Sequence, residues 1–450
     1  MFSYISGMSL YLDNMNKNIA PRILWPLIIA SCAPLLFIIK LPPKMTSSSI
    51  ALYLASLTGY AGLMLLLWMY VLGAKSVTRL FFKDLAPVLG VHKDLGKYGS
   101  IAFLLHPVFA VYGFFTPSLK SLTYIFLPNT SSLIYRHIAL GQIAFYCIAV
   151  IWVTSIFFRK RLGFRAWKYI HYFAYFSLPF AILHVPDLGP QFMASRMVKL
   201  YFLAIAGSFV VASLFRLGGW LNLDRKRYII VNHSKITDHD FMIVLQPTTD
   251  EWLAPEAGQY VYVKQGIISE DHPFSVTYYD EESGELTIIY RYTGTFTRYL
   301  TGLAQGEEVS IMGPFGAFTQ DIPEDGQQPV VYLAGGVGVT PFVQRLIDNR
   351  RDQSQLLFMA NRTHSTAPLV RTLKKALGDR LVAIYSRDMP AGVGEESGRI
   401  SEALLRKYIA APRSSVYYIC GSEPFVEECK RILGRMNIAP ERIRQEEFSW

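Results

Sequence analysis

Residues 91–106 read VHKDLGKYGSIAFLLH, and the two histidines of this stretch, His92 and His106, stand fourteen positions apart in an apolar segment. A second segment repeats the pattern, with His171 and His184 thirteen positions apart. At about 1.5 Å per helical residue these separations are about 21 Å and about 19.5 Å, so each helix would hold one imidazole near the inner face of a bilayer and one towards the outer face. The pattern predicts membrane helices that carry histidines at two depths.

The composition of the chain divides at Asn222. Up to that residue Lys and Arg number 19 against 4 Asp and Glu, and beyond it they number 25 against 30. The net charge of +10 therefore does not indicate nucleic-acid binding. With 51% apolar and 17% charged residues, the chain is neither disordered nor a small disulfide scaffold. Mean hydropathy is +0.25. The four cysteines lack CxxC spacing, which argues against a cysteine-bound metal.

Six apolar stretches before Asn222 are mostly close to the ~20 residues that cross a bilayer as a helix. They lie near 22–40, 50–74, 91–115, 133–158, 165–186 and 197–217. The basic connections, 75–97 and 159–168, are expected in the cytoplasm, which places both termini and everything after Asn222 there. We therefore expect an N-terminal cytoplasmic segment at 1–21, without the layout of a signal peptide, and a six-span transmembrane domain at 22–222.

The histidines of the third and fifth spans are predicted to pair by depth. Both spans run in the same direction, so His92 would lie level with His171, and His106 level with His184. Such imidazole pairs suit an iron porphyrin held through both axial positions, which favours electron transfer over gas binding. Thirteen positions do not return to the same helical face, so the fifth helix must bend or present its imidazoles from different sides, and Pro179 is a cause for a bend.

The remaining histidines carry weaker signals. Arg136 and His137 begin the fourth span on the outer side, where an interfacial anchor is favoured over contact with an acceptor or a haem propionate. His233, His239 and His364 have no partner pattern and are expected in solvated loops.

After Asn222, short β-branched runs separated by turns predict an antiparallel β-barrel over residues 223–323. One strand carries His272, Pro273, Phe274 and Ser275. The hydroxyl of Ser275 is suited to hydrogen-bonding a flavin ring nitrogen, and the flat side chains beside it could pack on the ring.

The turn that follows the next strand carries Arg291, Gly294 and Thr297. A glycine turn with free amides, a hydroxyl and a cation could hold a pyrophosphate, although an ordinary hairpin explains the same residues.

Residues 324–450 alternate buried strands with glycine turns and helices, which predicts a doubly wound α/β domain. Its first turn, LAGGVGVTPF at 333–342, leaves a strand and opens a helix, so phosphate oxygens could approach the backbone. The residues of interest are Gly335, Gly336, Gly338, Thr340 and Pro341. Pro341 departs from the usual GxGxxG spacing but is tolerated in a first helical turn.

Three further positions of this domain point to a nicotinamide nucleotide. Arg362 follows the second strand, where a cation favours the additional phosphate of NADPH over NAD. Cys420 and Gly421 end a later strand, at the sheet edge where nicotinamide would lie, although a buried structural cysteine is the alternative. Trp450 ends the chain and could cover a flavin face, or belong to a frayed tail.

Taken together, these motifs resemble the ferric reductase and NADPH oxidase superfamily, with a soluble part similar to a ferredoxin–NADP reductase module. The membrane signature is His92-Lys-Asp-Leu-Gly96 leading to His106, and Arg165-Ala-Trp167 leading to His171 and His184; the soluble signature is HPFS at 272–275, the turn at 336–341, CGSEP at 420–424 and the terminal aromatic. The resemblance implies FAD on the barrel, NADPH on the α/β domain and two b-type haems bound by the four histidines. Lys93 replaces a common arginine, and no calcium-binding loop precedes the spans.

The resemblance implies an integral protein of a bacterial inner membrane that passes electrons from NADPH through FAD and two haems to an acceptor outside, either dioxygen, giving superoxide, or a ferric chelate. Ser275, Cys420 and Trp450 would serve the flavin and nicotinamide chemistry. Two other functions stay open. The chain could be an electron-supplying subunit for a periplasmic or extracellular partner protein, or a non-catalytic membrane protein with a nucleotide-binding domain, which predicts no porphyrin absorbance.

Overall fold

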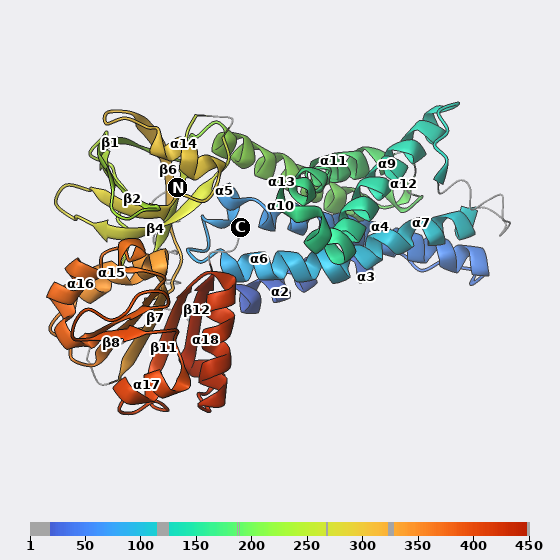
Figure 1. Ribbon diagram of the computed structural model, residues 1–450. Coiled ribbons are helices and arrows are strands. Elements are labelled where there is room, and N and C mark those ends of the chain that lie inside the picture. The colour runs from blue at the N-terminus through green and yellow to red at the C-terminus, as the bar shows by residue number, and fades with distance from the viewer. Residues whose placement is uncertain are drawn as a thin grey trace. The chain divides into compact units, whose positions relative to one another are not determined.

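The computed structural model describes residues 19–114, 126–186, 188, 190–266, 269–322 and 328–447. The chain divides into two compact units, Met1–Gly219 and Trp220–Trp450. The first unit is helical, and the second contains a β-barrel and a parallel sheet (Figure 1). A helical membrane part followed by an antiparallel barrel and an α/β domain is the predicted order of folds, and it is confirmed.

The helices of the first unit are α2 (Ile19–Cys32), α3 (Leu35–Ile38), α4 (Ser47–Leu72), α5 (Lys75–Thr78), α6 (Ala86–Asp94), α7 (Ser100–Phe114), α9 (Leu133–Val153), α10 (Arg159–His171), α11 (Ala174–His184), α12 (Pro190–Ala194) and α13 (Arg196–Trp220). Two five-residue π-helices continue neighbouring helices: η1 (Leu95–Gly99) joins α6 to α7, and η2 (Thr154–Phe158) joins α9 to α10. A π-helix shifts the rotational phase of the residues that follow it, and such segments are frequent at functional sites.

Two antiparallel helix pairs form the centre of the helical unit. The run α6–η1–α7 lies along α4, since His92 contacts the carbonyl of Met69 and His106 that of Ala55. In the same way α11 lies along α9, and His184 contacts the carbonyl of His137. The larger buried cluster of this unit includes Leu63, Leu66, Ala144, Leu178 and Ile205, from four of its helices.

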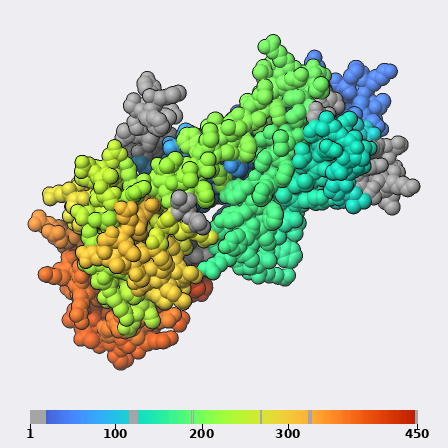
Figure 2. All heavy atoms as spheres, turned by 90° about the horizontal axis from the view of Figure 1, so that it is seen from above, coloured from blue at the N-terminus to red at the C-terminus, as the bar shows by residue number. Residues whose placement is uncertain are grey.

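Four helical stretches among the described residues are long and apolar enough to cross a membrane: Ile19–Ile38, Ser47–Leu72, Leu133–His184 and Arg196–Trp220. The predicted number of six spans is therefore not confirmed by this criterion. Large apolar side chains of α13 such as Leu203 and Leu214 are 59% and 62% exposed, as expected for a surface that faces lipid. The light-green spheres of Figure 2 show that α13 lies on the outside of the helical unit. An integral membrane protein accounts for such a surface.

The difference in count has two physical causes. The run 86–114 holds charged residues and His92 near its start and His106 further along, and these residues lower its hydropathy. The run Leu133–His184 holds two of the predicted spans, and its 52 residues would measure about 78 Å if straight, more than twice the hydrocarbon thickness. It leaves helical geometry at Gly163, where φ is 70° and ψ is 158°, and its two ends meet through His184 and His137.

The expected bend of the fifth predicted span lies at a different place from Pro179. The helix is interrupted at Tyr172–Phe173, directly after His171, whereas Pro179 lies inside α11 without ending it. Around the interruption, the amides of Phe173 and Phe176 bond to carbonyls three residues back rather than four. This tighter backbone begins at Tyr172, seven residues before Pro179, and it separates α10 from α11.

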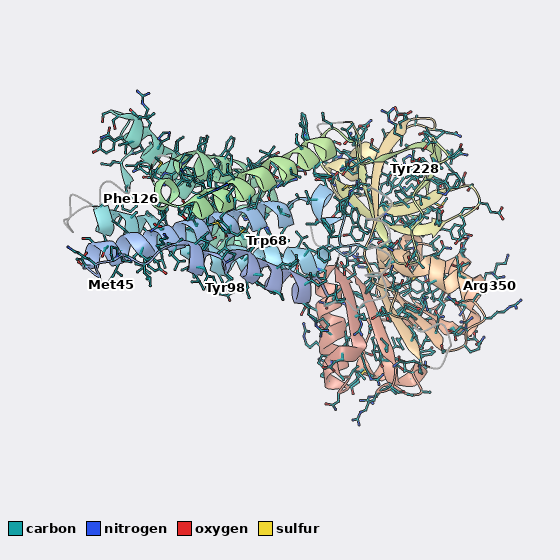
Figure 3. The ribbon with its side chains drawn as sticks, turned by 180° about the vertical axis from the view of Figure 1, so that it is seen from behind. Met45, Trp68, Tyr98, Phe126, Tyr228 and Arg350 are labelled. Carbon is teal, nitrogen blue, oxygen red and sulfur yellow. The ribbon has the colours of Figure 1, made fainter. Side chains whose placement is uncertain are left out.

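The barrel is closed and antiparallel, with strand order β1-β2-β5-β4-β3-β6. Its strands are β1 (Lys226–Lys235), β2 (Asp240–Pro247), β3 (Tyr260–Lys264), β4 (His272–Tyr279), β5 (Leu286–Arg291) and β6 (Glu308–Phe315), with α14 (Thr295–Thr301) between the last two. Alternating apolar residues fill the interior, among them Tyr228 (labelled in Figure 3), which is fully buried and accepts the amide of Leu253 at its hydroxyl.

The last part of the chain is a parallel six-stranded sheet in the order β10-β9-β8-β7-β11-β12. Its strands are β7 (Val330–Gly335), β8 (Gln355–Asn361), β9 (Leu381–Tyr385), β10 (Glu395–Ser397), β11 (Val416–Gly421) and β12 (Ile443–Glu447), and its α-helices are α15 (Thr340–Asp348), α16 (Val370–Leu377), α17 (Glu402–Tyr408) and α18 (Glu423–Arg435). Apolar clusters cover both faces, as a parallel sheet requires. The strand order reverses between β7 and β11, where such folds bind ligands.

Candidate functional site

The four predicted histidines meet as two facing pairs within the helical unit. The ring centroids of His92 and His171 are 6.1 Å apart, and those of His106 and His184 are 6.2 Å apart. Two nitrogens bound to opposite sides of one metal at about 2 Å each place their ring centroids about 6 Å apart. The side chains therefore fit a metal centre with two axial imidazoles, such as haem iron.

Backbone carbonyls orient three of these rings. The Nδ1 atom of His92 lies 3.1 Å from the carbonyl oxygen of Met69, and that of His106 lies 2.8 Å from the carbonyl of Ala55. His184 makes the same contact, 2.8 Å to the carbonyl of His137. Because a carbonyl only accepts, Nδ1 must carry the proton, which leaves the Nε2 lone pair of each ring available to a metal.

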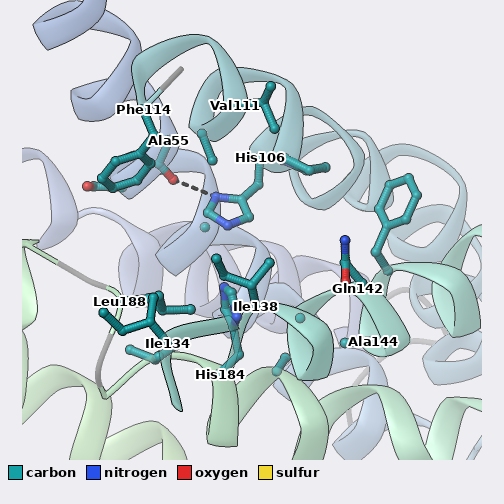
Figure 4. A pocket seen from close by; sticks show the side chains of 18 of the residues that line it. Ala55, His106, Val111, Phe114, Ile134, Ile138, Gln142, Ala144, His184 and Leu188 are labelled. Carbon is teal, nitrogen blue, oxygen red and sulfur yellow. Dashed lines mark hydrogen bonds between the residues drawn. The ribbon is translucent and has the colours of Figure 1, made fainter. Parts of the chain in front are cut away.

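A cavity of about 510 Å³ lies beside His106 and His184 (Figure 4). Its wall is mainly apolar, with Ala55, Ile138 and Leu188 among the lining residues, and Gln142 is one of a few polar groups. Cofactor sites in proteins have this size and character. His171 differs from the other three histidines, because its Nδ1 atom is buried without a hydrogen-bond partner among the described residues and its ring lies 4.9 Å from that of Trp167.

In the second unit, Trp220–Trp450, the strand predicted to serve a flavin is β4. Ser275 pairs with Tyr260 of β3 and is 5% exposed, while His272 stacks on Phe296 with centroids 3.8 Å apart. Pro273 and Phe274 lie between them and are half-buried. Tyr279, at the end of β4, donates its amide to Gln344 of α15 at 2.7 Å, so the predicted flavin strand packs against the helix that follows the glycine turn.

The turn around Gly294 differs from its prediction. Thr297 Oγ1 accepts from the amides of Thr293 at 3.0 Å and of Gly294 at 2.9 Å. These amides are therefore not free, and the hydroxyl predicted to hold a phosphate closes the turn itself. A threonine three residues after a glycine at a helix start is the local signal for this arrangement.

Arg291 is positioned by a residue that sequence reasoning missed. Asp240, on the neighbouring strand β2 and fully buried, accepts from Arg291 Nε at 2.7 Å and from a terminal guanidinium nitrogen at 3.0 Å. Thr237 donates its hydroxyl to the same carboxylate at 2.7 Å. The other edge of the guanidinium approaches Gly336, where a methyl group would lie 3.2 Å from it. Arg291 therefore lies between the barrel and the glycine turn.

The glycine turn itself is closely packed against the end of β11. Gly335 ends β7, and Gly336 has φ of +57° at the start of a short 3-10 segment, Gly336–Val339. A methyl group on Gly338 would collide with the carbonyl of Cys420 and lie 2.9 Å from the Cα atom of Gly421. The turn thus brings backbone to backbone at the reversal point of the sheet, as a phosphate-binding turn requires.

Thr340 and Pro341, the first residues of α15, stabilise the start of that helix. Thr340 is buried and donates its hydroxyl to the carbonyl of Val337 at 2.9 Å, and Pro341 occupies the first helical turn as expected. Cys420 is fully buried among apolar residues, and burial raises the pKa of its thiol well above the usual range. Its thiol is therefore protonated at neutral pH. Trp450 lies outside the described residues.

Arg362 directly follows β8 and is exposed, and its carbonyl accepts from the amide of Arg387 at 2.9 Å. Close by, His364 contacts Asp388 at 2.9 Å through Nδ1 and Glu395 at 3.1 Å through Nε2. The hydrogen bonds to Glu395 and then to Asp388 raise the pKa of His364. His364 is exposed in the short turn after β8, as expected of a loop histidine, but it has two carboxylate partners that were not predicted, one from the loop after β9 and one from β10.

His233 departs from the expectation of a loop histidine. It lies in β1, where Nε2 is 2.8 Å from the hydroxyl of Tyr290 and Nδ1 is 3.2 Å from the carbonyl of Leu303. His137 is half-buried on α9, its carbonyl serves His184, and Arg136 donates Nε to the carbonyl of Thr130 at 3.3 Å.

A segment in each half of the chain matches a known protein family. Residues 44–182 match the ferric reductase like transmembrane component, and residues 332–431 match the oxidoreductase NAD-binding domain. The chain joins a ferric reductase-like membrane domain to an oxidoreductase NAD-binding domain. The predicted resemblance is confirmed, and the imidazole pairs lie on helices of, or adjoining, the ferric reductase-like part.

Individual relatives cover part of the chain. The flavohemoprotein of Bacillus subtilis (strain 168) is 25% identical over 246 residues, which is 51% of this chain and 60% of the relative. The electron transfer subunit of dihydroorotate dehydrogenase B (NAD(+)) from Bacillus cereus (strain Q1) is 34% identical over 132 residues, 28% of this chain and 50% of the relative. The chain thus spans about half to three fifths of the length of these relatives.

Among solved structures, the flavohem-like FAD/NAD binding domain of nitric oxide dioxygenase from Vibrio cholerae O1 biovar El Tor matches at 18% identity with a TM-score of 0.44, covering 50% of this chain and 99% of that one.

Proposed function

We propose that this protein is a membrane-bound oxidoreductase that moves electrons from cytoplasmic NADPH, through FAD and two b-type haems, to an acceptor on the other side of the membrane. The observation that carries the proposal is the two facing imidazole pairs, with centroids 6.1 Å and 6.2 Å apart. One such pair could be a packing contact. Two pairs of equal spacing at different depths of one helical unit favour a chain of redox centres.

The geometry of the helical unit supports six crossings rather than four. The run 86–114 lies antiparallel along α4, which is itself long enough to cross, and contacts it at positions fourteen residues apart on both helices. The run Leu133–His184 is folded back on itself, because His184 at its end contacts the carbonyl of His137 near its start. Together with α2 and α13 these runs would give six crossings, and the basic loops then favour a cytoplasmic position for the second unit and both termini, as in a bacterial plasma membrane.

The side chains would act mainly by positioning. His92, His171, His106 and His184 would present Nε2 to the two irons. Bound FAD supplies the exchange between two-electron hydride chemistry and single electrons, which bound haem carries. A flavin finds support in the aligned relative named a flavohemoprotein.

In the second unit, Ser275 would hydrogen-bond the flavin, and the turn at 335–338 would hold the nucleotide phosphates against the backbone. Arg362 would select NADPH by its positive charge. Arg291, fixed by Asp240, would contribute its free edge to the phosphates between barrel and turn. The buried thiol of Cys420 would contribute shape at the nicotinamide site, and Trp450 would cover the flavin.

The test is a reduced-minus-oxidised spectrum of the purified full-length protein, with haem and flavin measured per chain. Two low-spin haems and one FAD per chain support the proposal, and a well-folded preparation without porphyrin overturns it. NADPH is then supplied with each acceptor. Dye reduction that superoxide dismutase abolishes identifies dioxygen, and turnover with a ferric chelate in the absence of oxygen identifies the metal. Turnover with neither acceptor until a second protein is added identifies the electron-supplying role.

A further inference from the structure

Two imidazoles of the helical unit rest directly on a glycine of the neighbouring helix. A methyl group placed on Gly141 of α9 would lie 2.5 Å from Nδ1 of His184, and one placed on Gly59 of α4 would lie 2.8 Å from Nδ1 of His106. Atoms that are not bonded ordinarily stay about 3.5 Å apart or more. An alanine at either position would therefore displace the ring.

A third imidazole, that of His92, also lies against a glycine of the neighbouring run, but at a greater distance. A methyl group on Gly73, directly after α4, would lie 3.4 Å from Cε1 of His92, an ordinary contact distance. In all three cases the glycine stands four positions after the residue whose carbonyl accepts from Nδ1 of the imidazole. The pairs of carbonyl and glycine are Ala55 with Gly59, Met69 with Gly73, and His137 with Gly141.

The arrangement has a geometric cause. In a helix the carbonyl of residue i points at the amide of residue i+4, so a side chain at i+4 stands beside any group that approaches this carbonyl from outside. The amide of Gly73, for example, bonds to the carbonyl of Met69 at 3.1 Å, and His92 shares that oxygen. A glycine at i+4 removes the obstacle, and a ring from the next helix can then reach the carbonyl.

The fourth imidazole lacks this arrangement. Ser155 stands fourteen positions after Gly141, as Gly73 stands fourteen after Gly59. Its hydroxyl oxygen accepts from Nε1 of Trp167 at 3.0 Å, and the Trp167 ring lies against His171. Nδ1 of His171 is buried without a partner among the described residues. Ser155 lies in the π-helix η2, which moves the helix surface out of the phase that α9 has at Gly141.

We propose that Gly59, Gly73 and Gly141 are positioning residues. Each lets an imidazole of the neighbouring helix reach a backbone carbonyl and donate a hydrogen bond to it: His106 at Gly59, His92 at Gly73 and His184 at Gly141. His171 lacks such a hydrogen bond. The proposal deepens the proposed function and rests on it. The His106–His184 pair then has two imidazoles that donate Nδ1–H, and the His92–His171 pair has one. Such a donated hydrogen bond fixes the ring and makes Nε2 more basic, which favours oxidised iron. The two haem sites would therefore differ in midpoint potential, because their histidines donate different numbers of hydrogen bonds.

The experiment compares glycine-to-alanine variants of the purified full-length protein by redox titration of the haem absorbance. In Gly141→Ala, the His106 and His184 component should either lose its low-spin absorbance or shift its midpoint potential to more positive values. The other component should keep its wild-type values. Gly59→Ala should act on the same component, and Gly73→Ala should change the other component less, since its ring has room for the methyl group.

The matched control is Gly207→Ala in the middle of α13, where a methyl group would meet no described atom within 4 Å. Alanine favours a helix over glycine, so apart from the displaced ring no loss of helix stability is expected at Gly59, Gly141 or Gly207. The inference is overturned if both haem components are unchanged in Gly141→Ala and Gly59→Ala, if both change alike, or if Gly207→Ala gives the same change. If Gly141→Ala does not accumulate, Gly59→Ala decides.

Failure of the underlying function looks different. A wild-type protein without two low-spin components would contradict the haem proposal itself. A wild-type protein with both components, and glycine variants that leave them untouched, would contradict only the seating of the imidazoles.

Discussion

Replacing Gly338 by alanine should disable the nucleotide site while leaving the rest of the chain folded. The added methyl group would collide with the carbonyl of Cys420 and lie 2.9 Å from the Cα atom of Gly421. Carbon atoms in contact stay about 3.5–4.0 Å apart, and both obstacles are backbone, so the turn must retreat by about 1 Å. A displacement of about 1 Å at a binding site lowers the rate about 100-fold, or about 2.7 kcal/mol.

The assay is anaerobic stopped-flow reduction of the flavin by NADPH, from which kcat/KM is obtained. Gly434→Ala in α18 is the control, since a methyl group there would meet no described atom within 4 Å. Flavin content should match the wild type in both variants, because the barrel is not altered. A Gly338→Ala protein that reduces its flavin within twofold of the wild-type rate would refute the assignment of this turn to the nucleotide.

Three further predictions concern other parts of the chain. His106→Leu should halve the haem content while NADPH still reduces the flavin, which absorbance spectra of the purified variant measure; retention of both haems would mean that the pairing is wrong. Arg362→Ser should lower kcat/KM for NADPH about tenfold and leave that for NADH unchanged, because one exposed charge-assisted contact is worth about 1.5 kcal/mol. The pKa of His364 is raised by the carboxylates of Glu395 and Asp388, so its stabilising effect is complete below about pH 6.5 and is lost as the pH rises through the raised value. The melting temperature of the wild type should therefore exceed that of His364→Gln most at pH 6 and converge with it at alkaline pH; a difference that grows with pH would contradict the ion pairs.

The parts of the fold that sequence predicted well depend on local pattern. β-branched runs and buried strands identified the barrel and the parallel sheet, and the spacing of His92, His106, His171 and His184 identified two levels of imidazole. Each of these signals is a regular pattern along the chain, so it can be recognised without knowledge of the tertiary structure.

The features that were missed come from segments far apart in sequence. Asp240 reaches Arg291 because β2 pairs with β5 in a register that places these residues opposite each other. His364 finds Asp388 and Glu395 only once β8, β9 and β10 lie side by side. Such partners depend on strand register, which no local motif specifies.

One missed feature did have a signal in the sequence. Gly59 and Gly73 are fourteen positions apart, the same separation as His92 and His106 on the neighbouring run. Antiparallel helices that lie side by side keep equal spacings in contact, so the match between the two intervals could have identified the glycines as the surface on which those imidazoles rest.

The burial of Cys420 and Cys429 in the second unit affects how the protein would resist oxidants, which single-electron chemistry near dioxygen can produce. Peroxide attacks the thiolate rather than the thiol, yet Cys420 is fully buried and burial raises the pKa of Cys429 to about 12. These sulfurs should resist sulfenic acid formation while the sheet is intact. Inactivation by a maleimide would then report that the domain had opened, and would say nothing of a nucleophile in turnover.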